Sequence, residues 1–140
     1  MEIPAEARAV LESDELAHMV TLNRDGSPQV TCVWVGLDGD EIVAAHLMRS
    51  QKVRNIERDP RVTLSIETKR ANDLGLLEYL VVHGRARIQE GGAPELLQEL
   101  AYTYLGPDVK FPPMPNPPPG YVSRTTVERL GGVGPWAPRH

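Results

Sequence analysis

Six short segments with strand patterning, separated by turn signals or short helices, constrain the fold of this chain most. Residues 29–37 are the clearest case, because they are rich in β-branched side chains and alternate between two faces. Val30, Cys32 and Trp34 share one face, and the residues between them share the other. The preceding residues 23–26, with the sequence NRDG, are typical of a hairpin turn. The other predicted strands are residues 18–22, 41–47, 61–67, 79–89 and 121–130.

The segments between these strands predict helices and one long loop. Residues 4–12 and 93–105 place apolar side chains at helical spacing, and a further helix follows residue 50. Residues 106–120 hold seven of the 13 prolines, so we expect an irregular, partly extended loop there. Residues 131–140 begin with GGVG, and we expect a flexible tail. These elements predict one domain over residues 1–140, a mainly β, α+β fold with a six-stranded antiparallel barrel and peripheral helices.

Composition and charge exclude several classes of function. The net charge of −4 argues against a general nucleic-acid binder, because phosphate backbones select basic surfaces. Cys32 is the single cysteine, which excludes an intrachain disulfide framework and is typical of a reducing compartment. The sequence opens with no signal segment, and no run approaches the ~20 apolar residues of a membrane helix. We therefore expect a soluble, cytoplasmic protein with neither nucleic acid nor membrane as a partner.

Side chains of the kind that do chemistry by themselves are scattered. The histidines have no metal-ligand spacing, and no Ser-His-Asp set or carboxylate pair stands out. We expect no metal site and no catalytic side chain. A bound cofactor would then supply the chemistry, and the protein would supply binding and orientation.

Residues 41–60 predict a strand, a short polar loop and a helix, and this arrangement suits an anion. Ser50 is the expected N-cap, with its hydroxyl accepting a hydrogen bond from an early helical N–H. Arg49, Lys52 and Arg54 lie within one turn of that helix start, where the free amides and the helix dipole also favour negative charge. We expect a phosphate or carboxylate to bind here. Asp59-Pro60 ends the helix.

The order of these elements resembles the split-barrel flavin-binding superfamily, which includes pyridoxamine 5′-phosphate oxidase and its deazaflavin-dependent relatives. The resemblance covers roughly residues 16–88. It depends on three motifs, RDGSPQVT at 24–31, SQKVRNIERDPRVTL at 50–64 and YLVVHGRA at 79–86. It implies an FMN-binding type of split β-barrel that forms a homodimer, with the cofactor between the two protomers.

The resemblance also implies which residues contact the cofactor. The strand residues Val30, Thr31, Cys32 and Val33 match the segment along the tricyclic ring, and Tyr79 lies on the strand that reaches the polar edge of the ring. His46 and Leu47 match the strand end beside the ribityl chain, and Ser50, Gln51 and Lys52 match the phosphate loop, next to the cation Arg49. Trp136 is the candidate for an aromatic lid over the site, contributed by the partner subunit.

The identity of the cofactor depends on residues 50–52. The FMN-dependent oxidases usually carry Ser-Arg-Lys there, whereas this chain carries Ser-Gln-Lys, which lacks a bidentate phosphate ligand. In this respect the sequence Ser-Gln-Lys resembles the corresponding segment of the coenzyme F420-dependent reductases of the superfamily. The expected function is hydride transfer from reduced F420 to a small, electron-poor organic substrate. Two alternatives stay open, namely an FMN-dependent oxidase or reductase of the pyridoxamine phosphate oxidase type, and a non-catalytic carrier of F420 or flavin.

Overall fold

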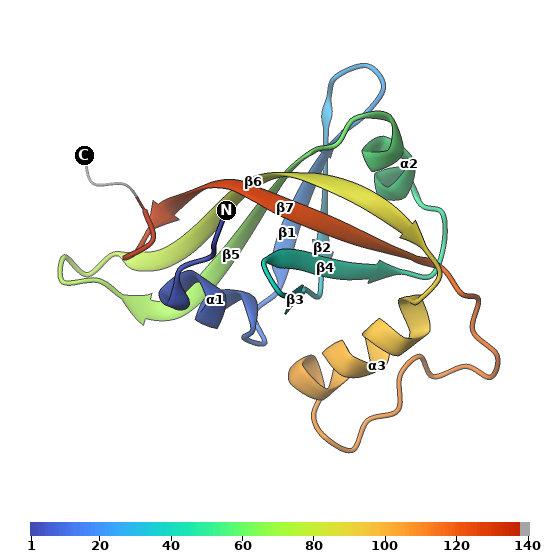
Figure 1. Ribbon diagram of the computed structural model, residues 1–140. Helices are drawn as coiled ribbons and strands as arrows, with labels where there is room; N and C mark the ends of the chain where they lie inside the picture. Colours follow the sequence, from blue (N-terminus) through green and yellow to red (C-terminus); the bar gives the residue numbers. More distant parts are fainter. Residues whose placement is uncertain (138–140) are drawn as a thin grey trace.

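The computed structural model describes residues 1–137 as one antiparallel sheet with three helices around it (Figure 1). Neighbouring strands follow the order β2-β1-β5-β6-β7-β4-β3. The strands are β1 (Ala17–Leu22), β2 (Pro28–Val33), β3 (Gly36–Asp38), β4 (Glu41–His46), β5 (Arg61–Ala71), β6 (Leu77–Glu90) and β7 (Tyr121–Val133). The helices are α1 (Ala5–Leu11), α2 (Gln51–Arg58) and α3 (Ala93–Tyr104). The predicted fold class is confirmed. The number of strands is seven rather than six, and the barrel is not closed.

The additional strand arises because the predicted segment 29–37 is split between the two edges of the sheet. β2 pairs with β1, whereas β3 pairs with β4 at the opposite edge. The chain crosses between these edges at Trp34 and Val35, and the N–H of Val35 donates a hydrogen bond to the hydroxyl of Tyr104 at 3.1 Å. Buried and more exposed residues continue to alternate through Trp34 and Val35, so the sequence pattern does not reveal that the chain turns from one edge of the sheet to the other there.

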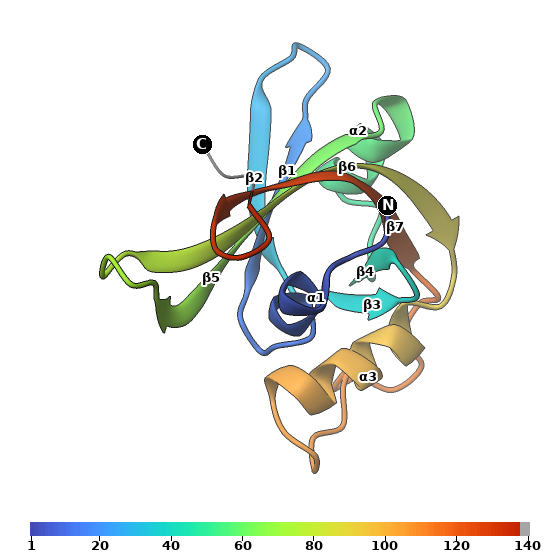
Figure 2. The ribbon, with the colours of Figure 1, turned by 60° about the vertical axis from the view of Figure 1, so that its left-hand side comes forward.

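Strands curl around a common interior that holds the core (Figure 2). Inward side chains alternate with outward ones along β1, β5 and β6, as expected for a sheet with one buried face. α1 packs against this core through Ala7 and Leu11, which are fully buried. The largest buried strand side chains include Met19, Leu64, Ile66, Leu80 and Val127.

Two segments are more regular than predicted. Residues 68–75 lie between the predicted strands 61–67 and 79–89. They extend β5 to Ala71 and turn into β6, which forms a hairpin that projects from the barrel (Figure 1). Its polar residues carry no strand signal, because most of the hairpin is exposed. Gly131–Val133, expected in the flexible tail, belong to β7. The tail expectation is wrong for these residues, and residues 138–140 lie outside the described part of the chain.

The proline-rich loop lacks regular structure, as predicted. It leaves α3 at the lower right of Figure 1 and returns to the start of β7. No helix among the described residues is long and apolar enough to cross a bilayer.

Candidate functional site

A pocket of about 240 Å³ lies where the sheet fails to close, between β2 and β4. We call it the gap pocket. β2 contributes Cys32 and Val33, and α2 contributes Lys52. Its other walls are apolar: Leu16, Trp34, Ala45, Leu97 and Phe111. The pocket thus combines a single ammonium group with flat and aliphatic walls.

Lys52 is the cation that the fold leaves available at this pocket. Its Nζ donates a hydrogen bond to Oγ1 of Thr31 at 3.1 Å, and no carboxylate in the described part of the chain pairs with it. Burial lowers the pKa of the Lys52 ammonium, because a charge is costly away from water. An anion beside Nζ would offset that cost.

Ser50 is the N-cap of α2 by backbone conformation, but its hydroxyl does not cap the helix as predicted. Its Oγ is buried and has no hydrogen-bond partner among the described residues. A buried hydroxyl without a partner costs free energy, so such an atom at a helix start marks a place for a polar ligand. The chemistry of this corner therefore fits the acidic end of a cofactor.

The two arginines beside Ser50 are already engaged. Arg49 forms an ion pair with Glu57 at 2.8 Å. Arg54 donates to the carbonyl of Arg49 at 2.9 Å and to Oε1 of Gln51 at 3.2 Å. The predicted cluster of three cations is therefore one available ammonium and two arginines with protein partners.

The predicted ring-binding residues lie on an edge strand. β2 pairs only with β1 among the described strands, so its other edge presents backbone N–H and C=O groups. Thr31 and Val33 face inward, and Val30 and Cys32 are exposed on the outer face. The structure thus brings Thr31, Cys32 and Val33 together with Lys52.

His46 and Leu47 end β4 near the same corner. The His46 imidazole is buried, and its Nε2 lies 3.0 Å from Oγ of Ser123. Burial, with a smaller effect of the nearby Lys52 charge, lowers the pKa of His46 to about 4, so the ring is neutral at pH 7. His46 therefore holds β4 to β7 through this contact. Leu47 is half-buried beside Arg49, in a separate shallow hollow.

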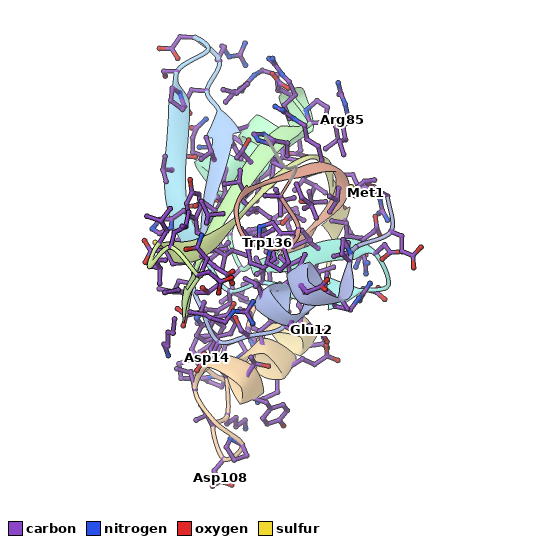
Figure 3. All side chains as sticks on the ribbon, turned by 90° about the vertical axis from the view of Figure 1, so that its left-hand side faces the viewer. Met1, Glu12, Asp14, Arg85, Asp108 and Trp136 are labelled. Carbon is purple, nitrogen blue, oxygen red and sulfur yellow. The ribbon has the colours of Figure 1, made fainter. Side chains whose placement is uncertain are left out.

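Tyr79 and Trp136 lie away from the gap pocket within this chain. Tyr79 is exposed on β6, where it pairs with Glu67 and Val133. Trp136 is only 7% exposed, and its Nε1 donates to the carbonyl of Gly131 at 3.0 Å (Figure 3). A side chain buried in its own core does not cover the site of a neighbouring subunit, so this position does not support the predicted lid role.

Sequence reasoning missed three residues that shape the site. Asn55 is fully buried in α2, and its amide donates to Oγ1 of Thr21 at 3.1 Å and to Oδ1 of Asn23 at 2.9 Å. Its Oδ1 accepts a hydrogen bond from Gln51 Nε2 at 2.8 Å. Trp34 and Phe111 form the aromatic wall of the gap pocket. A polar residue on the inner face of a helix was the available signal for Asn55. Nothing local links residue 34 to residue 111.

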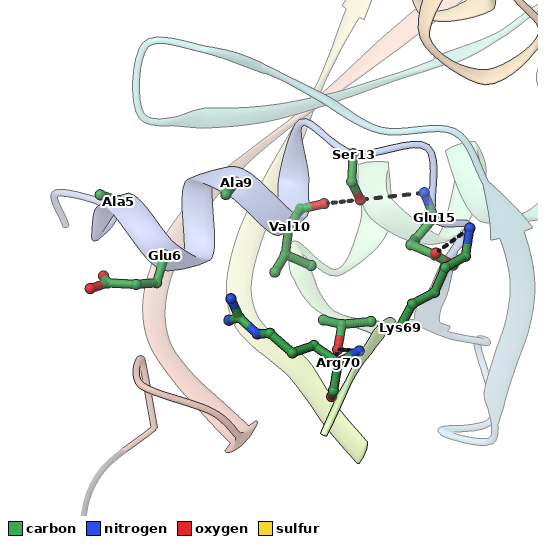
Figure 4. A pocket seen from close by; sticks show the side chains of 9 residues that line it. Ala5, Glu6, Ala9, Val10, Ser13, Glu15, Lys69 and Arg70 are labelled. Atoms are coloured by element: carbon green, nitrogen blue, oxygen red, sulfur yellow. Dashed lines mark hydrogen bonds and ion pairs between the residues drawn. The ribbon is translucent and has the colours of Figure 1, made fainter. Parts of the chain in front are cut away.

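A second hollow, of about 510 Å³, lies between α1 and the end of β5 (Figure 4). It contains no residue that the sequence predicted for a site. Its two cations are both paired, Lys69 with Glu15 at 3.3 Å and Arg70 with Glu78 at 2.8 Å. It therefore offers no free charge to an acidic cofactor, unlike the corner at Lys52.

Comparison with known families agrees with this geometry. The family model for pyridoxamine 5′-phosphate oxidase matches residues 3–131. The chain belongs to this family. The family is part of a superfamily of flavin- and deazaflavin-binding proteins built on the split barrel. The chain has no significant match among curated proteins.

Solved structures with the same fold include three with informative descriptions. An F420 reductase is 25% identical with a TM-score of 0.74, and the match covers 92% of this chain and 98% of that one. A FAD-binding protein from Mesorhizobium loti is 20% identical with a TM-score of 0.64, covering 93% and 94%. A putative pyridoxamine 5′-phosphate oxidase from Lactobacillus delbrueckii is 17% identical with a TM-score of 0.61, covering 93% of each chain. The last two likenesses show the fold alone.

Proposed function

We propose that this protein is a coenzyme F420-dependent reductase that binds the acidic end of the cofactor at the start of α2. Two features of residues 1–137 carry the proposal: the half-buried Lys52 has no carboxylate partner there, and the buried hydroxyl of Ser50, two residues earlier, has no hydrogen-bond partner there. Bound F420 would supply the hydride for a small, electron-poor organic substrate. The F420 reductase of the same fold and the residues Ser-Gln-Lys at 50–52 support this choice over FMN.

Each group at the site has a binding or orienting role in this proposal. Lys52 would donate a charge-assisted hydrogen bond to a phosphate oxygen, and Ser50 would donate from its hydroxyl. The free edge of β2 at residues 30–33 would align the ring through backbone groups, with Val33 and the aromatic wall excluding water. No side chain is assigned the transfer of a proton, because the described residues of the gap pocket hold no carboxylate or imidazole.

We further propose that two copies assemble through the outer faces of β1, β2, β5 and β6. Val30 and Tyr79 expose large apolar side chains on that face, and Leu16 exposes one directly before β1. Covering them would remove apolar surface from water and place the gap pocket at the edge of the interface. The exposed thiol of Cys32 supports a reducing compartment, and we propose the cytoplasm.

Titration of F420 fluorescence against purified protein tests the cofactor assignment. Lys52→Ala should weaken binding by about 1.5–3 kcal/mol, because it removes a hydrogen bond to a charged group. That loss corresponds to about a ten- to hundredfold rise in Kd. Ser50→Ala should give a smaller rise. Lys69→Ala is the matched control, since Lys69 is highly exposed at the far hairpin and should titrate like the wild type.

The alternatives give different results in the same preparation. A protein that purifies with tightly bound FMN and ignores F420 would support the oxidase reading instead. A carrier would bind F420 with the same dependence on Lys52 but would reduce no substrate in a turnover assay. Equal F420 affinities for the wild type and Lys52→Ala would reject the assignment of the acidic end.

A further inference from the structure

Phe111, one of the two residues in the aromatic wall of the gap pocket, lies on a loop that makes few hydrogen bonds to the rest of the described chain. Residues 107–118 of the proline-rich loop have no regular structure. Within the described residues, their hydrogen bonds to the rest of the chain both go to one side chain, Gln98 of α3. Gln98 Nε2 donates to the carbonyl of Val109 at 2.8 Å, and its Oε1 accepts from the N–H of Phe111 at 3.0 Å.

Those two hydrogen bonds hold the loop backbone at Val109 and Phe111, beside the place where the Phe111 ring contacts Trp34. Phe111 packs against Trp34 with ring centroids 5.2 Å apart and a tilt of 55°. Trp34 is stacked on Tyr104 of α3 at 5.3 Å. The hydroxyl of Tyr104 binds the backbone at both Val35 and Glu15. One side of the wall is therefore fixed by the contacts of Tyr104 with α3 and the strand corner, and the loop backbone on the other side is held by the hydrogen bonds of Gln98.

We propose that Gln98 is a positioning residue that sets which ligands the gap pocket admits, by holding the Phe111 ring against Trp34 as one wall of the pocket. A planar apolar ligand would lie against this wall beside the ring-binding strand. The proposal rests on the proposed function for the identity of the pocket, but it concerns a different part of it. Lys52 and Ser50 would bind the acidic end of the cofactor, whereas Gln98 and Phe111 would determine the shape of the aromatic wall of the pocket.

The test uses the cofactor-free protein and the probe 2,3-dimethyl-1,4-naphthoquinone. Both reactive ring positions of this planar quinone are blocked, so it does not alkylate Cys32, which lines the pocket. Binding is followed as quenching of Trp34 fluorescence, and Trp34→Phe identifies the part of the signal that belongs to Trp34. Trp136, the other tryptophan, is buried away from the pocket and supplies a constant background.

Gln98→Met keeps the length of the side chain and removes both hydrogen bonds. We expect it to weaken quinone binding about three- to tenfold, the same range as Phe111→Ala, since both lose the aromatic contact. Phe111→Leu should recover part of the loss. Thr103→Met, an exposed position on the same helix, is the matched control and should bind like the wild type. Amide hydrogen exchange at Phe111, whose N–H donates to Gln98, should rise in Gln98→Met and stay unchanged in Thr103→Met.

Two results would overturn the proposal. One is faster exchange at Phe111 in Gln98→Met with quinone affinity unchanged, and the other is a wild type that does not bind the quinone. F420 titration of the same variants separates this proposal from the proposed function. Gln98→Met should raise the F420 Kd less than Lys52→Ala does, because the charge-assisted contacts at Lys52 are intact. If the wild-type protein binds the quinone but not F420, the proposed F420-dependent function is rejected, and the proposed role of Gln98 is not.

Discussion

Lys52 and His46 illustrate how single side chains at this site are tuned by burial. Lys52 keeps an ammonium in a half-buried position, where its hydrogen-bond partner within residues 1–137 is the Thr31 hydroxyl. His46 is neutral, because burial lowers its pKa to about 4 and the Lys52 charge acts in the same direction. A cation and a neutral imidazole can therefore share one corner, and the positive charge there belongs to Lys52.

The lowered pKa of His46 predicts a pH dependence of stability. In the unfolded chain the pKa is about 6.5, so unfolding takes up a proton between pH 6.5 and 4. The contribution to the free energy of unfolding, about 3 kcal/mol, is fully present above pH 6.5 and is lost as pH falls through about 4. His46→Gln cannot titrate. The difference between wild type and variant in urea unfolding should shrink as pH falls, and a constant difference would contradict the assigned pKa.

Asn55 should support the proposed phosphate site by holding α2 in the fold, without contacting the phosphate itself. Asn55→Ala leaves the buried Thr21 hydroxyl and the Asn23 amide oxygen without their donor, so we expect a loss of about 2–3 kcal/mol in the free energy of unfolding. Gln51→Ala removes two hydrogen bonds at an exposed position, with Asn55 and Arg54, and should cost less than about 1 kcal/mol. Urea unfolding of both variants measures the difference, and similar losses would count against Asn55 as the anchor of α2.

At the scale of elements, the long pair β6–β7 depends on a glycine at its irregularity. The register shifts between His83 and Gly84, and a Cβ on Gly84 would collide with the carbonyl oxygen of Thr126. The two backbones approach too closely there for a side chain. Gly36 has a milder constraint, since its Cβ would lie 2.9 Å from a methyl group of Leu100 in α3.

Gly84→Ala should therefore destabilise the protein by about 1–3 kcal/mol, because a backbone neighbour cannot rotate away. Gly131→Ala, on the same strand pair, is the control, since its Cβ would only touch Val81 at 4.0 Å. Thermal unfolding should show a clear drop in Tm for the first variant and little change for the second. Equal Tm values for the two alanine variants would contradict the prediction, because they would show that β6 and β7 can move apart at Gly84 with little loss of stability.

At the scale of the whole molecule, the proposed homodimer makes a prediction about the outer sheet face. Val30 is 58% exposed on β2, and a charge there would have to be buried in the interface. Val30→Glu should shift the protein toward monomer in sedimentation velocity. Tyr102→Glu, at a similarly exposed position (52%) on α3, should leave the assembly unchanged. A wild type that sediments as a monomer at all concentrations would remove the dimer from the proposal.

Local signals in the sequence determined the class of this protein. Alternation identified the positions of the strands, the NRDG turn joined β1 to β2, and residues 50–60 marked the start and end of α2. These features depend on neighbours along the chain, so a single sequence reveals them. The same signals led to the family that the comparison then showed.

Only the tertiary structure decided how the site is assembled. Local pattern could not show that residues 29–37 turn a corner, because inward and outward faces continue through Trp34 and Val35. It could not show that Arg49 is paired with Glu57, or that Trp136 packs into its own core. Burial, ion pairing and the contact between Trp34 and Phe111 depend on segments distant in sequence. The free energies of these contacts depend on how the sheet curls and where it stays open. No single stretch of the chain determines that arrangement.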